Sequence, residues 1–90
     1  MKVRHLGLFE WKPETTPEQI DECWQLFDTM IDHIPGIISI EHGPYDSDEG
    51  LNDGFTHAFI MTFESPKHRD EYLPHPYHEK IKDALLPNLE

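Results

Sequence analysis

Three patterns in this sequence of 90 residues predict an α+β fold. Hydrophobic residues alternate with other residues in three short segments, as in β-strands, and recur at helical spacing in the segments between and after them. Proline, glycine and capping residues separate these segments. The predicted order is β-α-β-β-α, which is the order of a ferredoxin-like fold without its closing strand.

The first strand is expected over residues 3–11. Successive side chains of a strand point to opposite faces, and here both faces carry hydrophobic residues, so we expect both to be covered. One face carries Val3, His5, Gly7, Phe9 and Trp11, and the other carries Arg4, Leu6, Leu8 and Glu10.

The first helix is expected over residues 16–34. Thr16 is predicted as its N-cap, Pro17 as its first helical residue and Gln19 as the capping-box partner of Thr16. Pro35 and Gly36 should end it. The expected buried stripe consists of Ile20, Trp24, Phe27, Ile31 and Ile34, flanked by Cys23 and Met30.

A second strand is expected over 37–42, a polar loop over 43–54 and a third strand over 55–64. In the second strand the alternation places Ile38 and Ile40 on one face and Ile37 and Ser39 on the other. The remaining chain predicts a short helix over 65–73, a break at Pro74 and a last helix from His75. The expected apolar positions of that helix are Ile81, Ala84, Leu85 and Leu89.

One face of the predicted sheet has no helices to cover it, yet it is hydrophobic. Exposed apolar sheet faces of this kind normally mark an interface. We therefore expect a homodimer that packs sheet to sheet. The residues expected on this face are Leu6, Leu8, Ala58 and Ile60.

The composition excludes several classes of protein. The chain has 18 acidic against 7 basic residues, a net charge of −11, which disfavours nucleic acid and membrane surfaces as partners. The acids concentrate in the 46–53 loop and on the outer side of the first helix. One cysteine allows no internal disulfide, which suits the cytoplasm, and no apolar run reaches the ~20 residues of a membrane span. The start of the chain does not resemble a signal peptide.

Four motifs, in this order and spacing, resemble the stress-responsive A/B barrel (Dabb) family. The resemblance covers nearly the whole chain and implies a single domain over 1–90 that forms a dimeric α+β barrel. Family members usually continue into a further strand, so residues 88–90 are expected to lie where that closing strand would begin. The motifs are Arg4-His5-Leu6, Ile34-Pro35-Gly36-Ile37, the segment 49–58 and the segment 72–78.

The family includes stress-induced plant proteins and a polyketide cyclase, and the resemblance extends to the polar pocket positions of that cyclase. It implies that His5 and His57 correspond to two strand histidines of the pocket. Tyr72 and His78 match a tyrosine and a catalytic histidine beside the broken helix, and His75 matches a further pocket residue. The expected pocket walls are bulky and could fill the space themselves; they include Trp24, Phe27, Phe9 and Phe59.

Enolisation of a carbonyl compound needs a neutral base and a donor for the developing oxyanion. His78 suits the first role, because a helix that starts at Pro76 places it in the positive end of the helix dipole, which disfavours imidazolium. Tyr72 could supply the hydroxyl. The alternative is that His78 merely caps the helix and Tyr72 is an amphipathic residue at the rim.

His5 and His57 are expected on the helix-facing side of neighbouring strands. Two inward histidines on an apolar face cost free energy unless they are hydrogen-bonded, which predicts a polar pocket. The alternative is a pair of core histidines bonded to each other or to buried water.

No cofactor and no metal site is expected. His75 and His78 have helical spacing, but Pro76 holds His75 off the helix and separates the two rings. The acids of the 46–53 loop do not follow an EF-hand pattern. Cys23, beside Asp21 and Glu22, is expected to be a packing residue rather than a nucleophile. The resemblance alone implies a magnesium ion in some members, near residues 30–34.

Two functional hypotheses remain. In the first, the chain is an enzyme or enzyme-like protein that acts on a small aromatic or polyketide-like molecule, with acid–base chemistry and no redox cofactor. His78 is then the base, Tyr72 the oxyanion donor, and His5 and His57 the polar anchors. In the second, the chain is a non-catalytic, stress-related binding or scaffold protein.

Overall fold

The structure is a computed structural model that describes residues 1–44, 46 and 48–90. Its elements follow the predicted order, with α2 and the 3₁₀ helix η1 as short additions. Positions 45 and 47 of the predicted polar loop lie outside the described residues. The elements are β1 (Val3–Phe9), α1 (Pro17–Asp28), α2 (Met30–His33), β2 (Ile37–Pro44), β3 (His57–Phe63), α3 (Pro66–Tyr72), α4 (Pro76–Leu85) and η1 (Leu86–Asn88).

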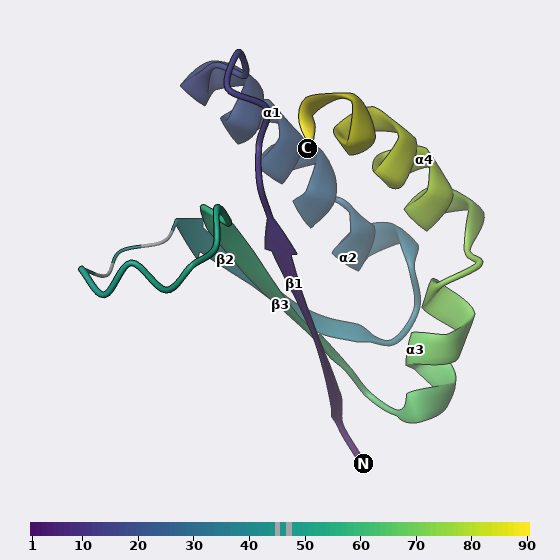
Figure 1. The fold of residues 1–90 in the computed structure, drawn as a ribbon. Coiled ribbons are helices and arrows are strands. Elements are labelled where there is room, and N and C mark those ends of the chain that lie inside the picture. Colours follow the sequence, from purple (N-terminus) through teal and green to yellow (C-terminus); the bar gives the residue numbers. More distant parts are fainter. Residues whose placement is uncertain (45, 47) are drawn as a thin grey trace.

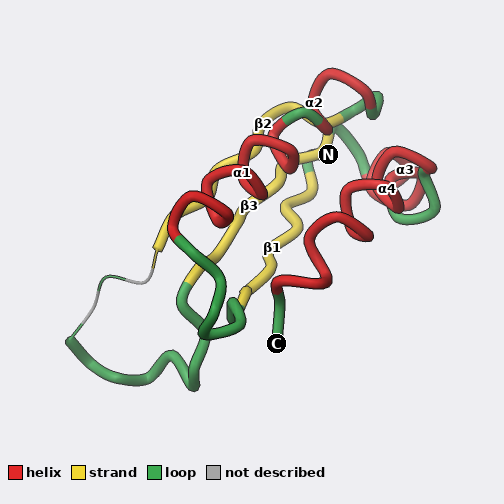
Figure 2. Tube along the Cα trace, turned by 90° about the horizontal axis from the view of Figure 1, so that it is seen from above, coloured by secondary structure: helices red, strands yellow, loops and turns green. Residues whose placement is uncertain are grey.

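The strands of the described residues form an antiparallel sheet in the order β1-β3-β2. The helices lie on one face of this sheet, and no helix or further strand of the described residues covers the opposite face (Figures 1 and 2). This arrangement confirms the predicted ferredoxin-like α+β fold. Beyond β1, Trp11 pairs with Leu89, so residues 88–90 run antiparallel to residues 10–12 at the free edge of β1.

The helix termini follow the capping signals in the sequence. The Thr16 hydroxyl accepts a hydrogen bond from the Gln19 amide at 3.2 Å, and the Gln19 side chain accepts one from the Thr16 amide at 2.8 Å. This is the predicted capping box. Ser65 caps α3 in the same way by accepting from the amide of His68.

The first helix is not continuous to residue 34, and the prediction that Ile31 belongs to its buried stripe is wrong. The amide of Thr29 bonds to the carbonyls of Leu26 and Phe27, and α1 ends at Asp28. Closure onto a carbonyl three residues back tightens the turn and rotates the residues that follow. As a result Met30 is fully buried, and Ile31 is 38% exposed.

The second strand contains a β-bulge that the alternation pattern did not reveal. The register with β3 shifts between Ile37 and Ser39, so Ile38 is the extra residue and is 41% exposed. A bulge reverses the alternation from that point on. The expected pairing of Ile38 with Ile40 on one face is therefore wrong: Ile37 and Ile40 share the helix-facing side, opposite Phe63 and Met61.

The core fills the space between the sheet and the helices. Met30, Met61 and Phe63 are its most deeply buried large side chains. Ile81 and Leu85 join it from α4 as expected, whereas Ala84 is exposed because it lies on the outer side of that helix. The remaining core residues are Trp11, Cys23, Trp24, Phe27, Ile34, Ile37, Phe59 and Tyr72.

The uncovered sheet face, called the outer sheet face below, carries the hydrophobic residues expected there. Leu6 is 66% and Leu8 is 61% exposed, and the β1–β3 register places Ile60 and Ala58 beside them. Arg4 and Glu41 lie on the same face, so it combines an apolar centre with charged residues near its border.

Candidate functional site

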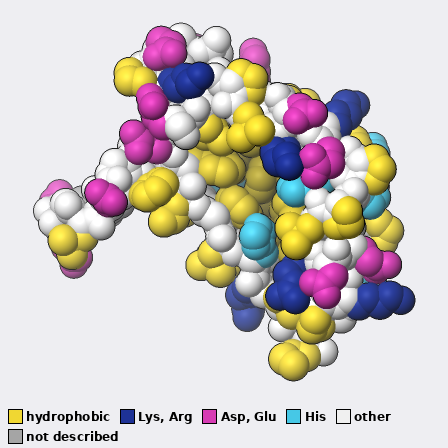
Figure 3. All heavy atoms as spheres, turned by 45° about the vertical axis from the view of Figure 1, so that its right-hand side comes forward, with side chains coloured by type: hydrophobic (Ala, Val, Ile, Leu, Met, Phe, Trp, Pro, Cys, Tyr) yellow, Lys and Arg dark blue, Asp and Glu magenta, His cyan; other side chains and the backbone are white. Residues whose placement is uncertain are grey.

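A cavity of about 190 Å³ lies between the helix-facing side of the sheet and the helices. The space-filling view shows a hollow floored by hydrophobic side chains, with histidines and basic residues at its border (Figure 3). Its lining is apolar apart from His5, Tyr72, His78 and Lys82. The apolar lining consists of Phe9, Phe27, Met30, Phe59, Ile81, Leu85, Leu86 and Leu89.

His78 enters the cavity from the third position of α4, since His75 is the N-cap and Pro76 begins the helix. Its Nδ1 lies 2.9 Å from the carbonyl oxygen of Leu73. A carbonyl oxygen can only accept, so Nδ1 carries a hydrogen in this arrangement. In the neutral ring, Nε2 then has the free lone pair and can take a proton from a ligand.

Tyr72 lies beside His78, with ring centroids 4.2 Å apart. The residue is 2% exposed, and burial raises the pKa of its hydroxyl to about 12. The hydroxyl therefore stays protonated at neutral pH. Within the described residues it has no hydrogen-bond partner, so it can donate to an oxygen of a ligand.

His5 faces the same cavity from β1, 6.0 Å from the Tyr72 ring and 5.5 Å from the Phe59 ring. Burial lowers the pKa of His5, and electrostatic interactions with His78 and Arg69 lower it further. A lowered pKa keeps the ring neutral at pH 7, with one donor and one acceptor nitrogen. His5 can thus hydrogen-bond a ligand without bringing a charge into the apolar cavity.

His57 faces the helices, as its register opposite Phe9 requires, but it does not line this cavity. Its Nδ1 lies 3.0 Å from the Thr56 hydroxyl, and its ring packs edge-on against Trp11. Burial lowers the pKa of His57, and nearby His42 lowers it further. The structure therefore does not pair the two inward histidines.

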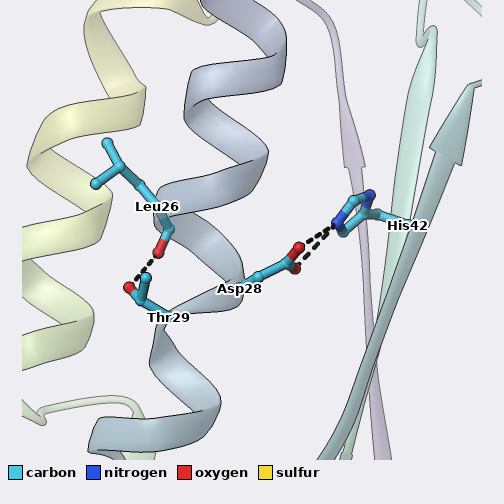
Figure 4. A network of polar contacts seen from close by, with 4 residues as sticks. All are labelled: Leu26, Asp28, Thr29 and His42. Carbon is cyan, nitrogen blue, oxygen red and sulfur yellow. Dashed lines mark hydrogen bonds and ion pairs between the residues drawn. The ribbon is translucent and has the colours of Figure 1, made fainter.

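Trp24 and His57 border a second, open groove. In this groove the ring of His42 stacks on Trp24, with centroids 4.2 Å apart and planes 7° apart. The Nε2 of His42 lies 3.0 Å from both carboxylate oxygens of Asp28 and links β2 to α1 (Figure 4). The sequence analysis did not predict this pair. The signal was available, because His42 lies two residues after inward-facing Ile40 and therefore points to the same face of the strand.

Lys82 was also missed among the cavity residues. It follows His78 by four positions on α4, the spacing that places two side chains on one helix face. That spacing is the signal that could have identified it. Phe27 and Phe59 line the cavity as expected, whereas Trp24 does not.

His75 lies outside the cavity lining and caps α4: its Nδ1 accepts the amide hydrogen of Tyr77 at 3.0 Å. This contact fixes the start of the helix that carries His78.

Metal-binding side chains are not assembled in the part of the chain that the structure describes. No three His, Cys, Asp or Glu residues there are grouped to hold a metal ion. At residues 30–34 the magnesium suggested by the resemblance would find one carboxylate, Asp32. His33 there bonds through Nδ1 to the Thr29 carbonyl and stacks on Tyr77. Because Mg²⁺ can be held by one or two carboxylates together with water, a magnesium ion near residues 30–34 stays a prediction.

Cys23 is buried, and burial is the main cause of its raised thiol pKa. Glu22 raises this pKa further, whereas the side chain of Asn88, 3.6 Å from Sγ, opposes the rise. A raised pKa leaves little thiolate at neutral pH, which is typical of a packing residue.

No helix in the described part of the chain combines the length and the hydrophobicity needed to cross a lipid bilayer.

Comparison with known proteins supports the fold. Olivetolic acid cyclase from Cannabis sativa is 30% identical over 84 residues, which cover 93% of this chain and 83% of the cyclase. The solved structure of At3g17210 from Arabidopsis thaliana has a TM-score of 0.94 at 32% identity, covering 98% of this chain and 85% of that one. The solved structure of a dimeric ferredoxin-like protein from Thermobifida fusca has a TM-score of 0.76 at 26% identity. The match covers 99% of this chain and 82% of that one.

The sequence model of the stress responsive A/B barrel domain matches residues 3–90. The chain therefore belongs to the stress responsive A/B barrel domain family.

Proposed function

We propose that this chain binds a small aromatic or polyketide-like carbonyl compound in the cavity and catalyses its enolisation. The observation that carries the proposal is the tautomer of His78. The bond from Nδ1 to the Leu73 carbonyl leaves Nε2 as the basic nitrogen, and the ring centroids of His78 and Tyr72 lie 4.2 Å apart. A base and an oxyanion donor in one apolar cavity are the two groups that this chemistry needs.

In the proposed reaction, His78 Nε2 takes a proton from the carbon next to a carbonyl group. The negative charge moves to the carbonyl oxygen, which Tyr72 stabilises by hydrogen bonding, while neutral His5 anchors another polar group of the ligand. In an aldol closure, the enolate carbon forms the new carbon–carbon bond and the attacked carbonyl oxygen takes up the proton. The oxidation level is conserved, so no redox cofactor is required. The name of olivetolic acid cyclase among the relatives supports this class of reaction.

The size of the cavity limits the substrate. A cavity of about 150 Å³ holds one benzene ring, whereas drug-sized ligands occupy roughly 300–1,000 Å³. At about 190 Å³, this cavity suits a single ring or a short acyl chain. Phe27 and Phe59 occupy much of the space between sheet and helices, which also favours the second hypothesis, a binding protein without catalysis.

The outer sheet face supports the assignment of the chain as a homodimer. Leu6 and Leu8 are more than half exposed there, and covering them with a second copy would remove apolar surface from water. A related protein of known structure is described as dimeric, which favours the same arrangement here.

The experiment follows the α-proton exchange of 4-hydroxyacetophenone in D₂O by NMR. It also measures the effect of this compound on the thermal stability of the protein. Wild type should accelerate exchange, and His78→Gln should lose about 10²–10⁴-fold of that rate. Tyr72→Phe should also slow exchange, because the oxyanion donor is removed. A ligand at 100 times its Kd should stabilise the fold by about 2.7 kcal/mol.

The matched controls are Tyr77→Phe and His57→Gln, which remove a hydroxyl and an imidazole outside the cavity. Both should retain exchange and binding. Binding without exchange above the solvent rate would contradict catalysis and support the binding protein. Absence of both ligand binding and accelerated exchange would refute the proposed site.

A further inference from the structure

The lining of the cavity differs in charge from the rest of the molecule. The chain has 18 acidic residues, yet none of the described residues that line the cavity is Asp or Glu. The one ammonium group among those lining residues is Lys82, and Arg69 of α3 acts electrostatically on His5. The described lining of the cavity thus carries no acidic side chain, although the two nearby cations are each paired with a carboxylate, Lys82 with Glu79 and Arg69 with Asp70.

Lys82 lies at the rim of the cavity. Its side chain is 43% exposed, whereas Ile81 and Leu85, beside it on α4, are buried in the core. Lys82 is one helical turn beyond His78, so a ligand that reaches His78 Nε2 also comes close to the ammonium group.

The present partner of Lys82 is easily replaced. Its Nζ lies 3.0 Å from one carboxylate oxygen of Glu79 and 3.2 Å from the other. Glu79 is 47% exposed and does not line the cavity. Exposed ion pairs contribute little to stability, so Lys82 can turn from Glu79 to a ligand at little cost.

A carboxylate is costly to bring to an apolar cavity without a charged partner, and the acidic coat of this chain repels it further. With Lys82 at the rim, the carboxylate can remain partly in water and form a charge-assisted hydrogen bond. The ring or chain attached to it then fills the apolar interior.

We propose that the ligand of this cavity is a carboxylate-bearing carbonyl compound and that Lys82 is the specificity-determining residue that binds its carboxylate. The inference rests on the proposed function, because it uses the same cavity. Lys82 positions the carbonyl group near His78 and Tyr72 and takes no part in proton transfer.

The test compares 3-acetylbenzoate with its neutral isostere 3-acetylbenzamide, by NMR titration at pH 7 and low salt. Wild type should bind the acid about tenfold more tightly than the amide, as expected for a charge-assisted hydrogen bond. Lys82→Gln should weaken acid binding about tenfold and leave amide binding unchanged. Glu79→Gln should strengthen acid binding, because it frees Lys82.

Lys67→Gln is the matched control, since it removes the same charge from an exposed position outside the cavity. It should leave the preference for the acid intact. Two results would overturn this inference but not the proposed cavity function. One is equal binding of the acid and the amide to wild type, and the other is a loss of acid binding in Lys67→Gln as large as that in Lys82→Gln. Failure of both probes to bind would overturn both.

Discussion

Single residues decide which groups of this protein can react. The backbone carbonyl of Leu73 accepts a hydrogen bond from Nδ1 of His78 and thereby fixes the tautomer of the ring. Tyr72 is kept protonated by burial, and His5 is kept neutral by burial together with electrostatic interactions with His78 and Arg69. These effects are local and electrostatic, and each can be tested by one substitution.

The lowered pKa values of His5 and His57 predict that stability falls in mild acid. The unfolded chain binds protons on these rings near the ordinary pKa of 6.5, whereas the folded chain binds them only at lower pH. Unfolding therefore takes up protons as the pH falls below about 6.5, and the free energy of unfolding decreases. Urea denaturation between pH 7.5 and 5.5 should show this decrease.

His5→Gln and His57→Gln should each flatten this pH dependence in part, and the double variant should flatten it further. An unchanged slope in the double variant would show that other groups cause the acid sensitivity. The proton uptake would then have to be sought elsewhere in the chain.

At the scale of elements, the close approach of β1 to β3 shapes the cavity wall. Gly7 lies on the helix-facing side of β1, opposite Phe59. A Cβ atom at Gly7 would lie 2.1 Å from Cε1 of the Phe59 ring, which is far inside van der Waals contact. The absence of a side chain at position 7 therefore allows Phe59 its place in the cavity lining.

Gly7→Ala should destabilise the fold by about 1–3 kcal/mol, as overpacking does, and should weaken ligand binding because the Phe59 ring must move. Gly43→Ala on β2 is the matched control, since nothing lies within 4 Å of a Cβ atom there. It should change stability by less than about 0.5 kcal/mol. Equal unfolding midpoints in urea for the two variants would contradict this account of the cavity wall.

For the whole molecule, the decisive feature is the outer sheet face. It carries exposed Leu6 and Leu8 on the side that the helices leave bare (Figure 2). A small domain buries a limited fraction of its surface, so a second copy packed on this face would contribute directly to stability.

We expect the wild type to sediment as a dimer at micromolar concentration and Leu6→Glu to sediment as a monomer. In a sheet-to-sheet dimer, the carboxylate of Leu6→Glu would be buried against the second subunit without a positively charged partner, which destabilises the interface. Leu26→Glu, at a 42% exposed position of α1, should remain dimeric. Monomeric wild type, or dissociation of both variants, would contradict an interface through the outer sheet face.

The sequence by itself determined the features that depend on neighbouring residues. It determined the order of the elements, the capping box of Thr16 and Gln19, and the helix start that places His78 at the third position. It also indicated that Leu6 and Leu8 would lie on a bare sheet face, because alternation in a strand is a local property. Family motifs identified Tyr72 and His78 as candidates for the site.

Only the tertiary structure decided which of these residues meet. The bulge at Ile38 separated Ile38 from Ile40, and the tightened turn at Thr29 moved Ile31 out of the buried stripe. Both features depend on packing between distant segments. The same packing separated His57 from the cavity of His5 and brought Asp28 to His42. It also placed Lys82 at the cavity rim. Alternation predicts the face on which a side chain lies, whereas its neighbours on that face depend on contacts between residues far apart in the chain.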